Sequence, residues 1–284
     1  VILFARNLKK FEQIKNLTND IRNIFSDKNY PILIDQEGGR VNRLNKLIET
    51  STLSAEFFGN LYKSNKKKFY NYYTVYIAQI SYLLNEIGIN INTVPVLDVR
   101  RAKSNNIIGN RSFSLVPKNV SNIGDFCIKK FNKEKIGTVI KHIPGHGLAK
   151  VDSHKKTPIV KKKTKYLYKN DFIPFKNKQT FFAMTAHVIY NDIDPINTAT
   201  HSPKIIKLIR NKIGFKNIII SDDISMKSLK YSIKLNTLKA LSAGCNLILH
   251  CNANYSEMRV VAENSPKVDN FIIKKTSQFY NFLS

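Results

Sequence analysis

Short apolar runs recur along this chain, and a polar loop and a longer segment with helical spacing follow most of them. Runs of this kind are typical of parallel strands that are covered on both faces. The seven runs are VILF (1–4), PILI (31–34), NTVPVL (92–97), GTVIKH (137–142), FFAMTA (181–186), NIIIS (217–221) and NLILH (246–250). The predicted helices cover residues 9–25, 53–87, 118–134, 203–213, 228–242 and 268–282. This alternation of strands and helices predicts an α/β fold.

The residues directly after the runs distinguish two α/β architectures. A dinucleotide-binding doubly wound sheet carries GxGxxG after its first strand, and no such motif follows here. Six of the seven runs are instead followed by, or end in, a polar or reactive side chain, namely Asp35, Asp98, His142, His187, Asp222 and Cys251. A (β/α)8 TIM barrel gathers its strand ends around one mouth, where the active site lies. We therefore expect one TIM-barrel domain over residues 1–284. Because seven runs are one short of eight, we expect it to lack the first strand and helix.

Composition narrows the class of protein without changing the predicted fold. The 284 residues are 43% hydrophobic, enough for a large core, and the formal net charge is +26. Lysines are scattered along the chain, with short clusters only at 66–68 and 161–163, and no nucleic-acid-binding motif accompanies them. We therefore expect no specific nucleic-acid partner. No apolar stretch is long enough to span a membrane, so we expect a cytoplasmic protein without membrane contacts.

The cysteines do not indicate disulfides. Cys127, Cys245 and Cys251 form neither an even set nor a CxxC pair. We interpret them as reduced thiols of the core.

Two strand ends carry groups suited to a sugar. In ILIDQEGGRVNRL (32–44), Asp35 precedes a glycine turn and then Arg40 and Arg43. A carboxylate beside guanidinium donors suits a polyhydroxylated ligand, and a structural Asp–Arg pair is the alternative. In KHIPGHG (141–147), Lys141 and His142 end a strand, and a tight loop carries His146. Because the proline and glycines disfavour a helix and no third ligand follows, we expect no metal and no organic cofactor.

The motif IIISDDISM (218–226) places two adjacent carboxylates at the end of a strand. Neighbouring side chains of a strand point in opposite directions, so only one of Asp222 and Asp223 can face the mouth. That carboxylate can act as a nucleophile or base, with its neighbour as a hydrogen-bonding support. A magnesium site for a phosphorylated substrate remains the alternative, although such a site usually needs more carboxylates.

Taken together, these motifs identify a family. IDQEGGRVNRL, IGNRSFS, KHIPGHG, VDSH, AHVIY and SDDISM, in this order and at these separations, resemble the β-N-acetylhexosaminidases of glycoside hydrolase family 3. The likeness is to the single-domain bacterial type that acts in peptidoglycan recycling, and it covers residues 1 to about 252. It implies a TIM barrel that removes terminal β-linked N-acetylglucosamine, with net retention, through a covalent glycosyl-enzyme.

The resemblance also implies roles for individual residues. Asp222 is the nucleophile, His154 of the VDSH loop is the acid/base, and Asp152 is its hydrogen-bond partner. The implied sugar-binding residues are Asp35, Arg43, Arg111, Lys141 and His142. The expected partner is a small carbohydrate, a muropeptide containing N-acetylglucosamine and anhydro-N-acetylmuramic acid, and we expect a monomer. An imidazole that titrates near neutrality can serve both as the acid and as the base.

The chain departs from the family pattern at three places. Asn110 and Asn246 stand where the family has aspartate, and Lys161–Lys163 make the segment after the VDSH loop strongly basic. The expected lack of the first strand and helix keeps open the alternative of a catalytically impaired sugar-binding derivative. A magnesium-dependent phosphosugar enzyme is a further alternative. Whether water or phosphate accepts the glycosyl group also stays open.

Overall fold

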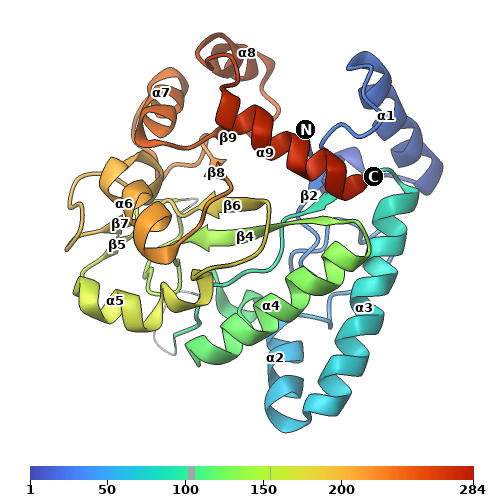
Figure 1. The fold of residues 1–284 in the computed structure, drawn as a ribbon, viewed down its shortest axis with the longest axis horizontal. Coiled ribbons are helices and arrows are strands. Elements are labelled where there is room, and N and C mark those ends of the chain that lie inside the picture. Colours follow the sequence, from blue (N-terminus) through green and yellow to red (C-terminus); the bar gives the residue numbers. More distant parts are fainter. Residues whose placement is uncertain (102–105, 154) are drawn as a thin grey trace.

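A computed structural model describes residues 1–101, 106–153 and 155–284 of the chain and shows a parallel sheet surrounded by helices (Figure 1). Each of the seven predicted runs contains a strand of this sheet, and every neighbouring pair is parallel. In spatial order the strands are β1 (Ile2–Leu3), β2 (Leu33–Ile34), β3 (Ile91–Asn92), β4 (Gly137–Ile143), β6 (Phe182–Thr185), β8 (Ile218–Asp223) and β9 (Leu247–Leu249). The α/β prediction is confirmed as a parallel, TIM-like half-barrel. The closed eight-stranded barrel is not shown. In the described residues the sheet has seven strands, with β1 and β9 at its two edges.

A second, two-stranded parallel sheet lies beside the first. It pairs β5 (Ile159–Val160) with β7 (Ile189–Tyr190). This sheet joins the segment after the VDSH loop to the chain that leaves β6.

The helices follow the predicted pattern with informative exceptions. They are α1 (Phe11–Ile24), α2 (Ala55–Ser64), α3 (Lys66–Glu86), α4 (Pro117–Lys133), α5 (Thr164–Asn170), α6 (Pro203–Leu208), α7 (Ile233–Ala243), α8 (Tyr255–Glu263) and α9 (Asn270–Leu283). The single helix predicted over 53–87 is wrong. Asn65 adopts an extended backbone there, and its side chain accepts the Lys68 N–H at 3.0 Å, so it ends α2 and caps α3. The helix predicted from 228 begins at Ile233, where the Ser232 hydroxyl caps it.

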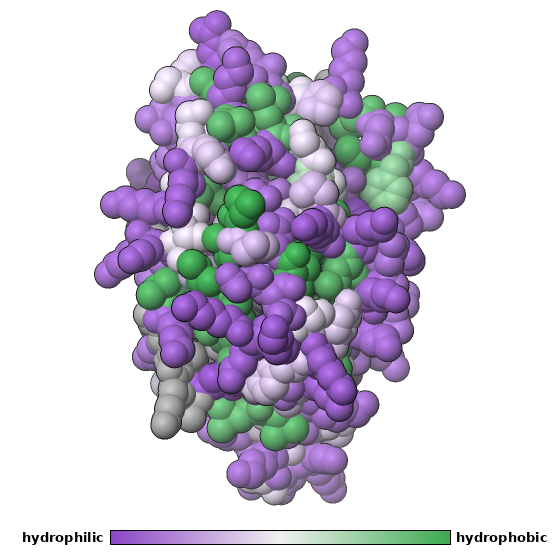
Figure 2. All heavy atoms as spheres, turned by 90° about the vertical axis from the view of Figure 1, so that its left-hand side faces the viewer, coloured by the Kyte–Doolittle hydropathy of each residue, from purple (hydrophilic) through white to green (hydrophobic). Residues whose placement is uncertain are grey.

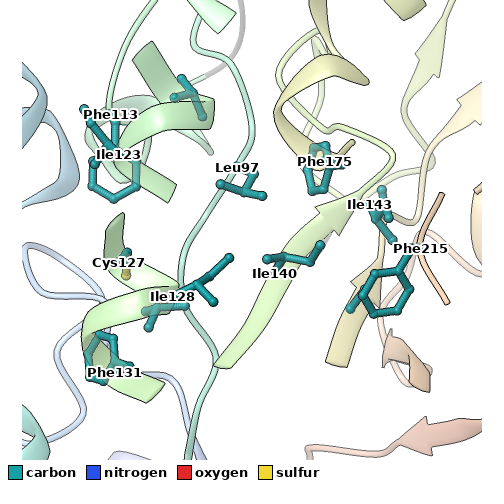
Figure 3. Close-up of a cluster of buried hydrophobic side chains, with 14 of the residues drawn as sticks. Leu97, Phe113, Ile123, Cys127, Ile128, Phe131, Ile140, Ile143, Phe175 and Phe215 are labelled. Atoms are coloured by element: carbon teal, nitrogen blue, oxygen red, sulfur yellow. The ribbon is translucent and has the colours of Figure 1, made fainter. Parts of the chain in front are cut away.

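Alternate residues of the strands face two apolar layers. Leu33, Val139 and Ile218 belong to the interior layer inside the curved sheet, whereas Ile34 and Ile219 face the helices. Figure 3 shows part of the outer layer, where Ile128 of α4 points toward Ile140 of β4. The two layers make the sheet a rigid platform for whatever its carboxyl ends carry.

Helix α9 contributes to the interior layer from the amino ends of the strands. Its Phe279 is fully buried against Phe181 and Phe182, with ring centroids 5.4 Å and 5.2 Å away. A Cβ atom on Gly137 would lie 2.6 Å from the Phe279 ring, so the first residue of β4 must be small. The N- and C-termini lie near each other on this side of the molecule (Figure 1).

The predicted cysteine environments hold for two of the three residues. Cys127 and Cys245 are free thiols buried in the core, whereas Cys251 is a half-buried free thiol at the carboxyl end of β9. No helix in the described ranges is long and apolar enough to cross a membrane.

Candidate active site

The polar residues that follow the strands lie at one edge of the sheet because every strand points the same way. This edge lies on the left in Figure 1, toward which β4 points. Figure 2 shows the molecule from that side, where hydrophilic side chains cover most of the surface around separate apolar patches. The site is therefore built from loops that parallel strands hold in place.

Lys141 is the centre of a buried ion-pair network. Its ammonium group lies 2.9 Å from Asp35 Oδ1, 2.7 Å from Glu37 Oε1 and 2.8 Å from Thr93 Oγ1. These contacts use all three donors of the ammonium group. Burial acts to lower the pKa of Lys141, but the charges of Asp35 and Glu37 outweigh it and raise that pKa. Lys141 is thus a fixed positive charge at the base of the site.

Arg111 is held by Glu37 in a two-pronged pair. Its Nε and one terminal nitrogen each donate to a different oxygen of Glu37 at 2.8 Å. Burial acts to raise the pKa of Glu37, but Arg111 and Lys141 lower it to about 2. A bidentate pair of this kind fixes the plane of the guanidinium group.

One oxygen of Asp35, Oδ2, keeps the capacity to accept a hydrogen bond. Burial acts to raise the pKa of Asp35. The charge of Lys141, a hydrogen bond from the Thr93 hydroxyl and the charge of Arg43 outweigh burial and hold that pKa well below the usual range. The Arg43 guanidinium lies 3.6 Å from Asp35 Oδ2, which is beyond hydrogen-bond range. That oxygen can accept a ligand hydroxyl, as the sequence motif predicts.

Asp98 orients His142. The Asp98 carboxylate is fully buried, and its Oδ2 lies 2.6 Å from His142 Nδ1. Because a carboxylate only accepts hydrogen bonds here, Nδ1 carries the proton, and Nε2 is the nitrogen left for a ligand. The other Asp98 oxygen accepts the His146 backbone N–H at 2.6 Å. One carboxylate thus positions both histidines of KHIPGHG.

The two aspartates at the end of β8 have different surroundings. Asp223 accepts hydrogen bonds from the Ser225 N–H and hydroxyl and from the Cys251 N–H. Asp222 accepts the Asp223 N–H at 2.8 Å. Burial acts to raise the pKa of Asp222, but the nearby His187 and His142 rings, the Asp223 N–H and the Lys141 ammonium group together outweigh it and lower that pKa. Asp222 is therefore an ionised carboxylate close to the sugar-binding groups.

His187 fixes the backbone beside Asp222. Its Nε2 donates to the Asp223 carbonyl at 2.9 Å, and its Nδ1 lies 2.7 Å from Thr200 Oγ1. Because the carbonyl can only accept, Nε2 carries the proton and Nδ1 accepts from the threonine. His187 thus holds the end of β8.

Ser153 of the VDSH motif contacts the KHIPGHG loop, since its hydroxyl lies 3.2 Å from His146 Nε2. The Asp152 carbonyl accepts the N–H groups of Lys155 and Lys156 at 3.0 Å and 2.8 Å. Burial lowers the pKa of Arg40, and the charge of Asp152 acts in the opposite direction. His154, the predicted acid/base, lies outside the described residues.

The structure thus brings together Asp35, Arg43, Arg111, Lys141, His142 and Asp222 from the predicted set. Sequence reasoning gave no role to Glu37, Thr93 or Asp98. Two of these residues could have been found from their positions in the sequence. Asp98 follows a predicted strand, and Glu37 lies two residues after Asp35. The departure at Asn246 is structural, since its Oδ1 accepts from Arg210 at 2.8 Å and from the Ile219 N–H at 2.9 Å.

Within residues 1–101, 106–153 and 155–284, no group of three or more His, Cys, Asp or Glu side chains is arranged to hold a metal ion.

A parallel α/β sheet with buried acidic and basic side chains at its carboxyl ends is typical of barrel-type enzymes, whose active sites lie at that end of the strands. Residues 1–276 match the Glycosyl hydrolase family 3 N terminal domain. The chain therefore belongs to glycoside hydrolase family 3, whose members hydrolyse glycosidic bonds.

Individual relatives agree with this assignment. The chain is 35% identical to a beta-hexosaminidase of Nitrosomonas eutropha over 89% of its own length and 73% of that protein's. It is 33% identical to a beta-hexosaminidase of Shewanella frigidimarina, over 89% and 74%. Native NagZ from Neisseria gonorrhoeae shares the fold with a TM-score of 0.87 and 26% identity, over 100% of this chain and 81% of that one. The structure of the same NagZ in complex with N-trifluoroacetyl-D-glucosamine gives the same TM-score, identity and coverage.

Proposed function

We propose that this chain is a retaining exo-β-N-acetylglucosaminidase that acts on peptidoglycan turnover products carrying terminal β-linked N-acetylglucosamine. The observation that carries the proposal is the ionised Asp222 beside the Lys141–Asp35 and Asp98–His142 pairs. Two curated relatives named beta-hexosaminidase support the reaction class. The Neisseria complex with an N-acylated glucosamine supports the sugar.

The reaction proceeds in two displacements. An oxygen of Asp222 attacks the anomeric carbon while the bond from that carbon to the aglycone oxygen breaks. His154, oriented by Asp152, gives its proton to the departing oxygen. Water then attacks the same carbon and loses a proton to His154, which releases the sugar and restores the Asp222 carboxylate.

The remaining groups bind the sugar. Asp35 accepts a hydroxyl hydrogen, and the cationic Arg43, Arg111 and Lys141 balance the acidic side chains around it. His142, held by Asp98, presents Nε2 to the substrate. The anhydro-muropeptide aglycone, the cytoplasmic location and the monomeric state remain predictions. The family match does not favour the magnesium-dependent or the non-catalytic alternative.

The first test is the rate on an aryl β-N-acetylglucosaminide. We expect Asp222→Ala to lower turnover by about 10³-fold or more, because the variant lacks the attacking group. The matched control is Asp192→Ala, since Asp192 lies near the surface and pairs with Lys163. Wild-type rates in Asp222→Ala would refute the assignment.

A further inference from the structure

The loop of KHIPGHG reaches the VDSH segment through one side chain. The His146 imidazole is buried, and its Nε2 lies 3.2 Å from the Ser153 hydroxyl, which is also buried. Ser153 lies between Asp152 and His154 in the chain. The contact therefore joins the acid/base segment to the loop that follows β4.

The chain that follows β3 fixes the backbone at His146. Its N–H donates to Asp98, the carboxylate that orients His142. A Cβ atom on Gly147 would lie 1.9 Å from the Val99 carbonyl oxygen, so the loop sits directly on the chain after β3. The sugar-binding site thus fixes the backbone that carries the His146 ring.

Ser153 also makes a contact through its backbone. Its carbonyl accepts the Ser228 N–H at 3.1 Å, and the Thr157 hydroxyl donates to the Ser228 carbonyl at 2.7 Å. Ser228 belongs to the loop that follows β8 and the nucleophile. The segment is therefore tied to both loops that carry the catalytic and sugar-binding groups.

The His146 ring is uncharged near neutral pH, which suits a hydrogen bond to the Ser153 hydroxyl. Burial, together with the nearby His142, lowers the pKa of His146 to about 4, so the ring is neutral at pH 7. A neutral imidazole carries one donor and one acceptor nitrogen, and a hydroxyl can complement either. Its Nδ1 is buried and has no hydrogen-bond partner in the described residues. The Ser153 contact is thus the ring's hydrogen bond.

We propose that His146 is a positioning residue that acts through Ser153 to hold the Asp152-containing segment over the site. The inference rests on the proposed function, because it assigns the segment the acid/base step. His146 gives no proton to the substrate. Its effect is on the position of Asp152, the residue before Ser153.

The kinetic test compares two aglycones. We expect His146→Ala to slow a β-N-acetylglucosaminide with a poor, alkyl leaving group about tenfold or more beyond its effect on a dinitrophenyl glycoside, because only the former needs a proton. His146→Gln, which keeps a hydrogen-bonding end, should restore part of the loss. Ser153→Ala should reproduce the pattern, and adding it to His146→Ala should change little further.

The matched control is His201, another buried histidine whose pKa burial lowers to about 4 and whose Nε2 lacks a partner in the described residues. Its ring centroid lies 6.1 Å from that of Tyr231, with the two ring planes tilted by 40°, and none of its described hydrogen bonds involves residues 151–153. His201→Ala should leave the ratio of the two rates unchanged. Equal losses on both aglycones in His146→Ala, or a wild-type ratio in Ser153→Ala, would overturn the inference.

Amide hydrogen exchange separates this inference from the proposed function. Exchange at residues 152–157 should quicken in Ser153→Ala and His146→Ala and stay unchanged in His201→Ala, whether or not the chain hydrolyses the glycosides. Unchanged exchange in the first two variants would contradict the positioning role. A wild-type chain inactive on aryl glycosides would instead contradict the proposed function.

Discussion

Burial keeps several imidazoles of this protein uncharged. The pKa of His146 and of His201 is lowered to about 4, and that of His187 is also lowered, in each case mainly because burial penalises the charged form. An unfolded chain would bind protons on these rings near pH 6.5. Below that pH the unfolded state therefore gains protons that the folded state refuses, and stability falls until the folded pKa is reached.

We accordingly expect the thermal unfolding midpoint to fall as pH decreases from 7.5 to about 4.5. Asp171 acts in the opposite sense, since burial raises its pKa to about 6 and it contributes more stability once protonated, but the histidines outnumber it. Calorimetry of the wild type and His201→Gln checks this, and the variant should show a shallower pH dependence. A midpoint that rises toward pH 4.5 would contradict the assignment.

The sequence pattern predicted the residues of the sugar-binding site better than the residues that hold them in place. Asp35 and Asp222 follow apolar runs, so strand counting placed them at one edge. Glu37 could not be assigned, because the pair that gives it a role joins it to Arg111, 74 residues away. Asp98 likewise gains its role from His142, 44 residues along the chain.

Elements were predictable where the pattern reflects burial on two faces. The seven strands are short apolar runs because they lie between two apolar layers. The break between α2 and α3 was missed because a single asparagine, Asn65, makes it inside a continuous helical pattern. The short helix α8, which has no buried residue, gave no apolar stripe to detect.

The packing of α9 yields a prediction about stability. Phe279→Ala should lower the free energy of unfolding by about 3–5 kcal/mol, because it leaves a cavity in the interior layer. Phe271 lies on the same helix with 36% exposure, so Phe271→Ala is the control and should cost about 1 kcal/mol. Denaturant unfolding measures both values. Equal losses in the two variants would show that α9 does not fill the interior.

Across the whole molecule, the charge of the site differs from that of the surface. The chain has 46 lysines and arginines against 20 acidic residues. At the mouth, however, the acidic Asp35, Glu37, Asp98 and Asp222 are matched by the permanent cations Arg40, Arg43, Arg111 and Lys141. The positive surface therefore does not describe the reaction centre, and the function follows from the site rather than from the net charge.

The central claim is that Asp222 forms a covalent bond with the sugar. The most direct measurement is mass spectrometry of the wild-type chain after incubation with a 5-fluoro N-acetylglucosaminide that carries a good leaving group. The fluorine slows both displacements, and the leaving group keeps the first faster than the second, so the intermediate accumulates. We predict a mass increase of one glycosyl unit on the peptide that contains Asp222. A label on another residue, or hydrolysis of the analogue without any label, would contradict the account.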